Sequence, residues 1–312
     1  MNTTRRFVSQ TFSVQHRDGF TLMELLVVMA TLAVLAVVLL PALAGTKPNT
    51  QAFQCMNNQR QIILAWQMYA ADNSGLLPPN DWYSCNGGLS GSYRGLPFDF
   101  SWVGGEMDQV TGNTQATNTA LLSNPKYAAL AKYATNVAIY HCPSDQSVVQ
   151  PYGQRVRSVS MNSAIGSVWN HPNPAAGKML GGPLPAGFLD GNGWNGNSLS
   201  HYWQTCNKLG NIKNPSDIFV IADESPFSIN DALFYMSMGP PDANGNPSST
   251  SIIDTPASYH NGGCTFAFAD GHVEIHRWLG STIKITAAQY NYPAKDSLVD
   301  LQWLQSRTTA AK

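Results

Sequence analysis

Three side chains that could bind a metal alternate near the C-terminus: His272, Glu274 and His276. In an extended strand, residues two apart project from the same face, so these three would share one face. Two imidazoles and a carboxylate are a set from which a three-ligand metal site can be built. The same spacing also describes the polar, solvent-facing side of an ordinary amphipathic strand. The polar side is the favoured interpretation, and the metal site stays open.

A second group of residues has the types needed for acid–base chemistry. His260 and Asp270, together with His272 or Glu224, could in principle serve a hydrolase. However, the chain contains neither a G-x-S-x-G nucleophile elbow nor an H-E-x-x-H motif. Asp270 is also accounted for by a turn, as described below. The sequence therefore predicts that the protein is not an enzyme.

Five cysteines are spread along the chain, at Cys55, Cys85, Cys142, Cys206 and Cys264. They form no CxxC pair and no Cys/His cluster with zinc-finger spacing, so the sequence predicts no structural zinc site. If the domain is exported, one or two disulfides can form. Because five is an odd number, at least one thiol would then stay free or pair between chains.

The candidate metal ligands lie next to the clearest local structure, a predicted β-hairpin. Segments 264–269 and 272–278 flank Asp270-Gly271, a dipeptide that favours a two-residue type I′ turn. That turn places Phe268 opposite Val273 and predicts an apolar face, with the three candidate ligands on the other face.

A helix and a buried strand are predicted to support this hairpin. Residues 50–72 have helical periodicity and Thr50 as a plausible N-cap, after a break at 45–49 that contains Pro48. The predicted apolar stripe consists of Cys55, Ile62, Trp66 and Tyr69, with Phe53, Met56 and Ile63 beside it. The run 218–222 is a short apolar stretch typical of a buried strand.

Shorter elements and two loop-rich insertions are predicted between them. A helix is expected at 121–135, and strands are expected at 137–141 and 157–162. Segments 80–125 and 170–202 are rich in Gly, Asn and other loop-forming residues. The combination indicates an α+β fold.

The N-terminal region has the character of a membrane anchor. Residues 1–19 are polar and carry Arg5, Arg6 and Arg17, whereas Leu22–Leu43 is almost wholly apolar. As a helix, these 22 residues reach roughly 33 Å, and the hydrocarbon core of a bilayer is about 30 Å thick. The positive-inside rule keeps the leader in the cytoplasm and exports the chain that follows the span.

The junction Gly19-Phe20-Thr21-Leu22-Met23-Glu24 closely resembles the processing site of type IV prepilins and type II secretion pseudopilins. The resemblance implies cleavage after Gly19 by prepilin peptidase and N-methylation of Phe20. It also implies that Glu24 pairs with the freed Phe20 α-amino group of a neighbouring subunit. A carboxylate within an apolar span is costly and is usually retained for such a partner. The alternative to such pairing is that the Glu24 side chain reaches the water at the membrane edge, as in an ordinary signal anchor.

The C-terminal half carries a second resemblance. His260 followed by Asp270-Gly271 has the H-x9-DG spacing of a processing-associated domain found in many prepilin-like proteins. Segments 55–61, 142–145 and 158–162 resemble the same group. The departures are Tyr259, where a basic residue is usual, and the insertion at 170–202.

The resemblance to pseudopilins also suggests calcium as a ligand, since some relatives of the G-type pseudopilin bind it. Asp223, Glu224 and the loop Asp72-Asn73-Ser74 offer oxygen ligands, but no loop has EF-hand spacing. No cofactor is therefore predicted.

Together these features predict a pilin-like α+β protein whose long N-terminal transmembrane helix packs on an antiparallel sheet. The expected parts are a cytoplasmic leader (1–19), a transmembrane helix (20–44) and an exported globular domain (45–312) that contains the motif at 260–271. The expected function is structural, in a type II secretion or type IV pilus-like system. The expected partners are prepilin peptidase, other pseudopilin subunits and the inner-membrane secretion platform. The protein would span the inner membrane once, with its C-terminal domain in the periplasm or at the cell surface.

One alternative gives a different topology. Ala42-Leu43-Ala44 before Gly45 resembles an ordinary signal-peptidase site, and cleavage there would release a binding or hydrolytic protein. In that case its Trp-rich loops could contact a polymer such as polysaccharide. Charged residues are 12% of the chain and the net charge is −1, so nothing indicates nucleic acid as a partner.

Overall fold

The computed structural model describes residues 21–80, 101–108, 114–169, 179–183, 187–191 and 200–312. For 36–49, 168–169, 179–183 and 187 it describes the backbone only. The chain divides into two compact units, Met1–Lys47 and Pro48–Lys312. Helix α1 (Leu22–Asp72) begins in the first unit and ends in the second. The predicted break at 45–49 is therefore wrong: Pro48 removes one backbone donor, and the helix continues through it.

Helix α1 begins with a reciprocal cap. The Thr21 backbone N–H donates to Glu24 Oε2 at 2.9 Å, and the Glu24 N–H donates to Thr21 Oγ1 at 3.3 Å. This is a capping box, which satisfies backbone donors that have no partner inside the helix. Gly19 and Phe20 lie outside the described residues.

The apolar side chains that follow the cap are exposed along the described part of the first unit. Leu22 is 81% exposed and Leu35 is 55% exposed. Among the described residues, no helix combines the length and the apolar character required of a membrane span. The side chains of 36–43, which complete the predicted span, are outside that set.

The second half of α1 packs on the globular unit through the predicted stripe. Ile62, Ile63 and Trp66 are fully buried, and Cys55 is 1% exposed. Phe53, predicted to lie beside the stripe, is 73% exposed and points away from the core.

A five-stranded sheet forms the centre of the globular unit, with the order β10-β9-β6-β3-β7. The strands are β3 (Val159–Asn162), β6 (Phe219–Asp223), β7 (Leu233–Phe234), β9 (Gly263–Phe268) and β10 (Val273–Arg277). All pairings are antiparallel except β3 with β7, so the sheet is mixed rather than antiparallel as predicted. The α+β class is confirmed, as is the buried strand predicted at 218–222.

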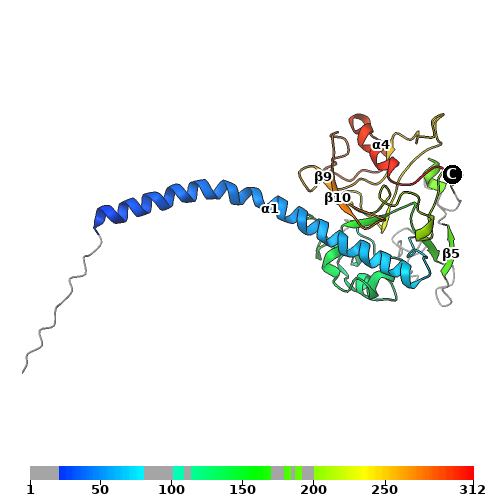
Figure 1. Ribbon diagram of the computed structural model, residues 1–312, viewed down its shortest axis with the longest axis horizontal. Coiled ribbons are helices and arrows are strands. Elements are labelled where there is room, and N and C mark those ends of the chain that lie inside the picture. Colours follow the sequence, from blue (N-terminus) through cyan, green and yellow to red (C-terminus); the bar gives the residue numbers. More distant parts are fainter. Residues whose placement is uncertain (1–20, 81–100, 109–113, 170–178, 184–186, 192–199) are drawn as a thin grey trace, which may run out of the picture. The chain divides into compact units, whose positions relative to one another are not determined.

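Helices cover both faces of this sheet (Figure 1). On one face, Trp66 and its neighbours in α1 pack with Val220 and Ala267. On the other face, Leu301 and Leu304 of α4 (Leu298–Ser306) join a cluster with Phe266. Residues of β6 and β9 thus supply two separate cores, with Phe266 and Phe268 of β9 in one and Ala267 in the other.

The remaining elements are short. The helical turns are η1 (Gln115–Thr117), α3 (Ala120–Ser123), η2 (Ala129–Lys132), η3 (Val137–Tyr140), η5 (Gly187–Asp190), η6 (Leu209–Asn211) and η7 (Lys295–Ser297). The two-stranded pairs are β1 (Val148–Val149) with β2 (Gly153–Gln154), β4 (Ser167–Trp169) with β5 (Met179–Pro183), and β8 (Ser251–Ile252) with β11 (Tyr292–Pro293).

Two local predictions in this part are wrong. The helix predicted at 121–135 is divided into α3 and η2. The strand predicted at 137–141 is the 3-10 turn η3, because the Asn136 side chain accepts a hydrogen bond from the Ala138 N–H at 3.1 Å. Such local side-chain caps favour a turn over an extended strand.

The β9–β10 hairpin forms where it was predicted, but its register differs by one residue. The Phe268 N–H donates to His272 O at 2.9 Å, so the loop has three residues, 269–271, rather than two. Gly271 occupies the left-handed region at φ 101°, as a three-residue loop requires. Because a one-residue shift reverses the faces, Phe266 lies opposite Glu274 and Val273 lies opposite Ala267.

Candidate metal centre

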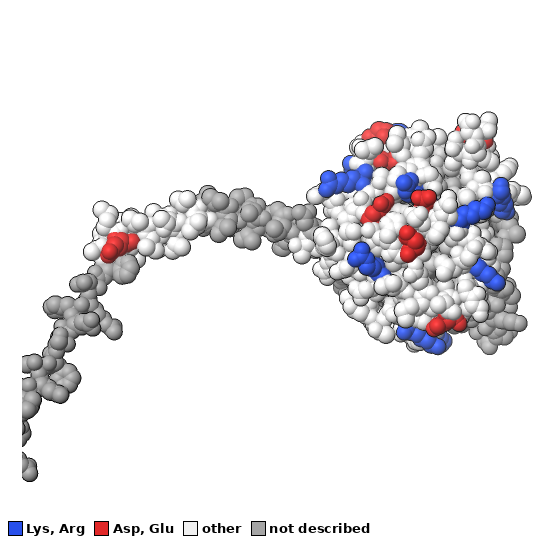
Figure 2. Space-filling view, in the orientation of Figure 1, with Lys and Arg blue, Asp and Glu red and all other residues white. Residues whose placement is uncertain are grey.

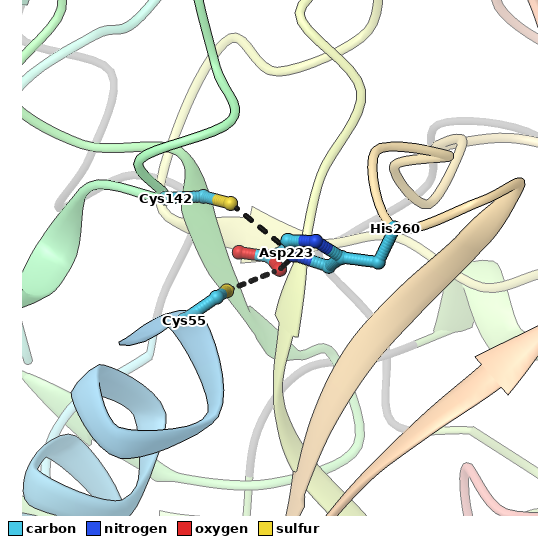
Figure 3. Close-up of side chains that lie close together, drawn as sticks. All are labelled: Cys55, Cys142, Asp223 and His260. Carbon is cyan, nitrogen blue, oxygen red and sulfur yellow. Dashed lines mark hydrogen bonds and ion pairs between the residues drawn. The ribbon is translucent and has the colours of Figure 1, made fainter. Parts of the chain in front are cut away.

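Four side chains from distant parts of the chain converge at one buried point (Figure 3). They are Cys55 of α1, Cys142 after η3, Asp223 at the end of β6 and His260 before β9. Their potential ligand atoms all lie within 4.8 Å of one another. None of the four residues is more than 4% exposed.

Hydrogen bonds hold three of the four segments in place, and strand pairing with Val159 of β3 holds Asp223. One turn after Cys55, the Gln59 side chain donates to Thr265 O of β9 at 3.0 Å and ties α1 to the sheet. The Cys142 N–H donates to Ser158 Oγ at 2.8 Å. His260 is held by a tight turn, since its N–H donates to Gly263 O at 3.3 Å.

The four side chains contact one another directly. Cys55 Sγ donates to Asp223 Oδ2 at 2.9 Å, and Cys142 Sγ lies 3.4 Å from His260 Nε2. The same Nε2 lies 3.8 Å from Asp223 Oδ2. Asp223 Oδ1 and His260 Nδ1 are buried without a hydrogen-bond partner among the described residues. An unpaired buried acceptor is costly, and the lone pairs of Asp223 Oδ1 remain available to a further partner.

Burial sets the protonation of the cluster. It raises the pKa of the Cys55 thiol well above its ordinary value and also raises the pKa of the Cys142 thiol. Removal from water raises the pKa of Asp223 to about 6 and lowers the pKa of His260 to about 4. The surroundings thus disfavour charge on all four groups.

This geometry does not suit nucleophilic catalysis. In a Cys–His–Asp triad, the acid orients the imidazole nitrogen that faces away from the thiol. Here Asp223 and Cys142 both lie beside Nε2 of His260, while Nδ1 is unpartnered. The cluster is also closed to a substrate, because all four side chains are buried.

The candidate ligands at 272–276 do not form a group of close metal-ligating atoms. His272 Nδ1 lies 2.7 Å from Asp270 Oδ1, and its ring stacks on Phe268. His276 stacks on Trp303 with ring centroids 3.7 Å apart. These interactions follow from the shifted register, which places His272, Glu274 and His276 opposite apolar residues of β9. Within the described part of the chain, the cluster around Cys55 is the only group of three or more close metal-ligating residues.

The two ends of the H-x9-DG spacing have different roles. His260 belongs to the buried cluster, whereas Asp270 lies in the hairpin loop and accepts from the His272 N–H at 3.1 Å. Next to Gly271, the Gln67 side chain of α1 donates to Ala269 O at 3.0 Å. The loop end of the motif therefore lies beside α1 at Gln67, and the His260 end lies in the cluster that includes Cys55 of α1.

Other interactions engage three of the candidate calcium ligands, Glu224, Asp72 and Asn73. Glu224 accepts from Ser160 Oγ at 2.5 Å and from Ser228 Oγ at 2.8 Å in the core. Asp72 accepts from the Tyr133 hydroxyl at 2.9 Å, and the Asn73 side chain donates to Tyr69 O at the end of α1.

The sequence does not predict this cluster as a unit. Cys55, Cys142 and His260 each fell in a segment with a family resemblance, and Asp223 was a candidate oxygen ligand. The useful signal would have been that three such segments each begin with a cysteine or a histidine. Cys206 and Cys264 are free and buried, and Cys85 lies outside the described residues.

Comparison with known proteins gives one family. Residues 50–204, just under half of the chain, match the family described as a protein of unknown function (DUF1559). This is a family typical of bacterial prepilin-like proteins. The matched segment contains Cys55 and Cys142, whereas Asp223 and His260 follow it. No curated protein and no solved structure matches the chain.

Proposed function

We propose that this protein is a prepilin-like structural subunit of a type II secretion or type IV pilus-like system. The leader would be removed after Gly19 by prepilin peptidase, and Phe20 would become the N-methylated terminus. The single observation that carries the proposal is the Gly19–Glu24 sequence. The family match over 50–204 supports it.

The start of α1 suits such processing. The cap formed by Thr21 and Glu24 begins the helix two residues after the proposed cleavage point, so a shortened chain keeps its helix start. Apart from Glu24 and Thr31, the side chains from Leu22 to Leu35 are apolar, and all of them are exposed. An apolar surface of this kind is stable only when lipid or neighbouring helices cover it. We infer that the segment is anchored in the inner membrane and packs with equivalent helices.

Glu24 would contribute to assembly as well as to the cap. Its carboxylate is exposed while it accepts from Thr21, so a neighbouring subunit can approach it. In the apolar environment between helices, the free α-amino group of Phe20 would neutralise this charge. Residues 45–312 form a bulky globular part, which favours a minor or tip-like position over a filament shaft.

The exported globular part would interact with other pseudopilin subunits or with the secretion platform. Figure 2 shows basic and acidic groups interspersed on the visible face of the globular unit. Such mixed charge supports contacts with proteins rather than a basic surface for a polyanion.

The mature N-terminus provides the test. We expect mass spectrometry of the protein from its native membrane to find N-methylated Phe20. A terminus at Gly45 would overturn the proposal in favour of a protein released after Ala44, and an intact leader would overturn it as well. Glu24→Ala should leave cleavage unchanged and reduce co-purification with other pseudopilins. Thr21→Val, which removes the hydroxyl of the same cap but keeps the acid, serves as the matched control.

A further inference from the structure

We propose that Cys55, Cys142, Asp223 and His260 form a structural site for one divalent zinc-class cation, which fixes α1 to the central sheet. The proposal is independent of the function proposed above. It concerns only the globular unit and would hold for any exported protein with this fold.

The ligand set fits this class of metal. Thiolate, imidazole and carboxylate are the three ligand types that zinc takes in proteins. Two sulfurs, one nitrogen and one oxygen give four protein ligands, the number found in closed structural sites. A catalytic site keeps one position open for water or substrate, and full burial of these four residues leaves no such position.

The distances are close to those that a tetrahedral site requires. Bonds of about 2.0–2.3 Å to a central ion place neighbouring ligand atoms roughly 3.3–3.8 Å apart. The separation of Cys142 Sγ from His260 Nε2 is 3.4 Å, and that of His260 Nε2 from Asp223 Oδ2 is 3.8 Å. The 2.9 Å between Cys55 Sγ and Asp223 Oδ2 is a hydrogen bond that deprotonation and a small side-chain movement would open.

The unpaired atoms are an independent indication. Asp223 is completely buried, and its Oδ1 has no hydrogen-bond partner among the described residues. Buried carboxylates are normally paired or coordinate a metal. A cation bound at the cluster would compensate this charge.

The main competitor is a disulfide between Cys55 and Cys142, whose sulfurs lie within 4.8 Å in the cluster. A disulfide would consume both thiols, which an oxidising compartment permits. It would leave Asp223 and His260 buried side by side with no role, whereas a cation uses all four residues. The metal site is therefore the more complete explanation.

The location of the site gives the cation a structural task. Its four ligands come from α1, the turn after η3, the end of β6 and the loop before β9. One ion would join segments that are otherwise held by packing and by bonds such as that from Gln59 to Thr265. Because the unfolded chain has no preformed site, metal binding would add directly to folding stability.

The test uses the full chain purified in detergent under reducing conditions. We expect mass spectrometry of the metal content to find one zinc per chain. Replacement by Co²⁺ should produce the strong visible absorption of tetrahedral cobalt and a thiolate charge-transfer band in the near ultraviolet. A strong chelator should lower Tm, and added Zn²⁺ should restore it.

Variants separate the cluster from other residues of the same types. Cys142→Ser and His260→Gln should each lose the metal, whereas Cys206→Ser and His272→Gln should keep it. If the site variants do not fold, the cobalt spectrum of the unaltered chain still decides the question. Absence of bound metal, with no spectral response to Co²⁺, would overturn the proposal. A chain isolated without reductant that holds no metal and has a Cys55–Cys142 cross-link would overturn it in favour of the disulfide.

Discussion

Cys55 Sγ lies 2.9 Å from Asp223 Oδ2. A residue of helix α1 thus contacts the end of strand β6, 168 positions later in the chain. This contact and the hydrogen bonds from Gln59 to Thr265 O and from Gln67 to Ala269 O hold α1 against the sheet. The globular unit thus depends on a few long-range polar contacts in addition to its two apolar cores.

Gln59→Ala should destabilise the globular unit. The substitution removes the buried bond from Gln59 Nε2 to Thr265 O, at a cost of about 1–3 kcal/mol. Gln61→Ala is the matched control, because Gln61 bonds within α1 to Asn57 O at the surface. Urea unfolding followed by fluorescence measures both, and equal midpoints for the two variants would contradict the role of Gln59.

Trp66→Ala should have a larger effect, since Trp66 is fully buried where α1 packs on the sheet. Loss of a buried aromatic side chain typically costs about 3–5 kcal/mol. Phe53→Ala, on the exposed side of the same helix, should leave Tm nearly unchanged. A comparable loss of Tm for Phe53→Ala would mean that its side chain is covered in the folded protein.

Gly271→Ala should weaken the β9–β10 hairpin. Gly271 has φ 101°, and an added Cβ would lie 3.3 Å from the Gln67 side chain. A left-handed conformation costs an L-residue about 1–2 kcal/mol. Gly210→Ala, where an added Cβ meets nothing within 4 Å, is the control. Thermal unfolding should show a lower Tm only for Gly271→Ala, and an unchanged Tm would refute the three-residue loop.

Asp231 should make stability depend on pH. Burial raises the pKa of Asp231 to about 6, above the ordinary value of 3.8, although Arg157 nearby opposes the shift. Because the folded state holds the proton more tightly than the unfolded state, this group stabilises the fold below about pH 4. Its contribution is lost as the pH rises to about 6.

Asp231→Asn should therefore be more stable than the unaltered chain at pH 8, by about 1–3 kcal/mol, and equal to it near pH 4. The amide oxygen can still accept from the Leu233 N–H, as Asp231 Oδ1 does at 2.7 Å. Urea midpoints at several pH values measure the difference. A variant that is less stable at pH 8 would indicate that the attraction to Arg157 dominates.

Sequence periodicity was sufficient for the elements that bury one continuous face. The stripe of α1 and the strand at 218–222 follow from local apolar spacing, and both are present. The hairpin shows the limit of prediction from local sequence. Asp270-Gly271 favours a two-residue turn, but Ala269 also joins the loop because its N–H donates to Ile218 O of the segment leading into β6. That tertiary bond could not be predicted from the local sequence, and it reverses which residues face each core.

The buried cluster could not be predicted from the local sequence for a related reason. Its four residues lie in four segments, and each has an ordinary local context. Cys142 follows a helical turn, and Asp223 ends a strand. Only the order β9-β6-β3 and the crossing of α1 bring them together, and neither follows from spacing along the chain.

The strand order also limits how the protein can be divided. The segment 50–204 that matches a family contributes a single strand, β3, to the five-stranded sheet, and both neighbours of β3 come from later residues. A recombinant piece that stopped at 204 would leave β3 without hydrogen-bond partners on either edge and the stripe of α1 facing water. Such a fragment would tend to aggregate, so the family boundary is not a boundary at which the chain can be cut.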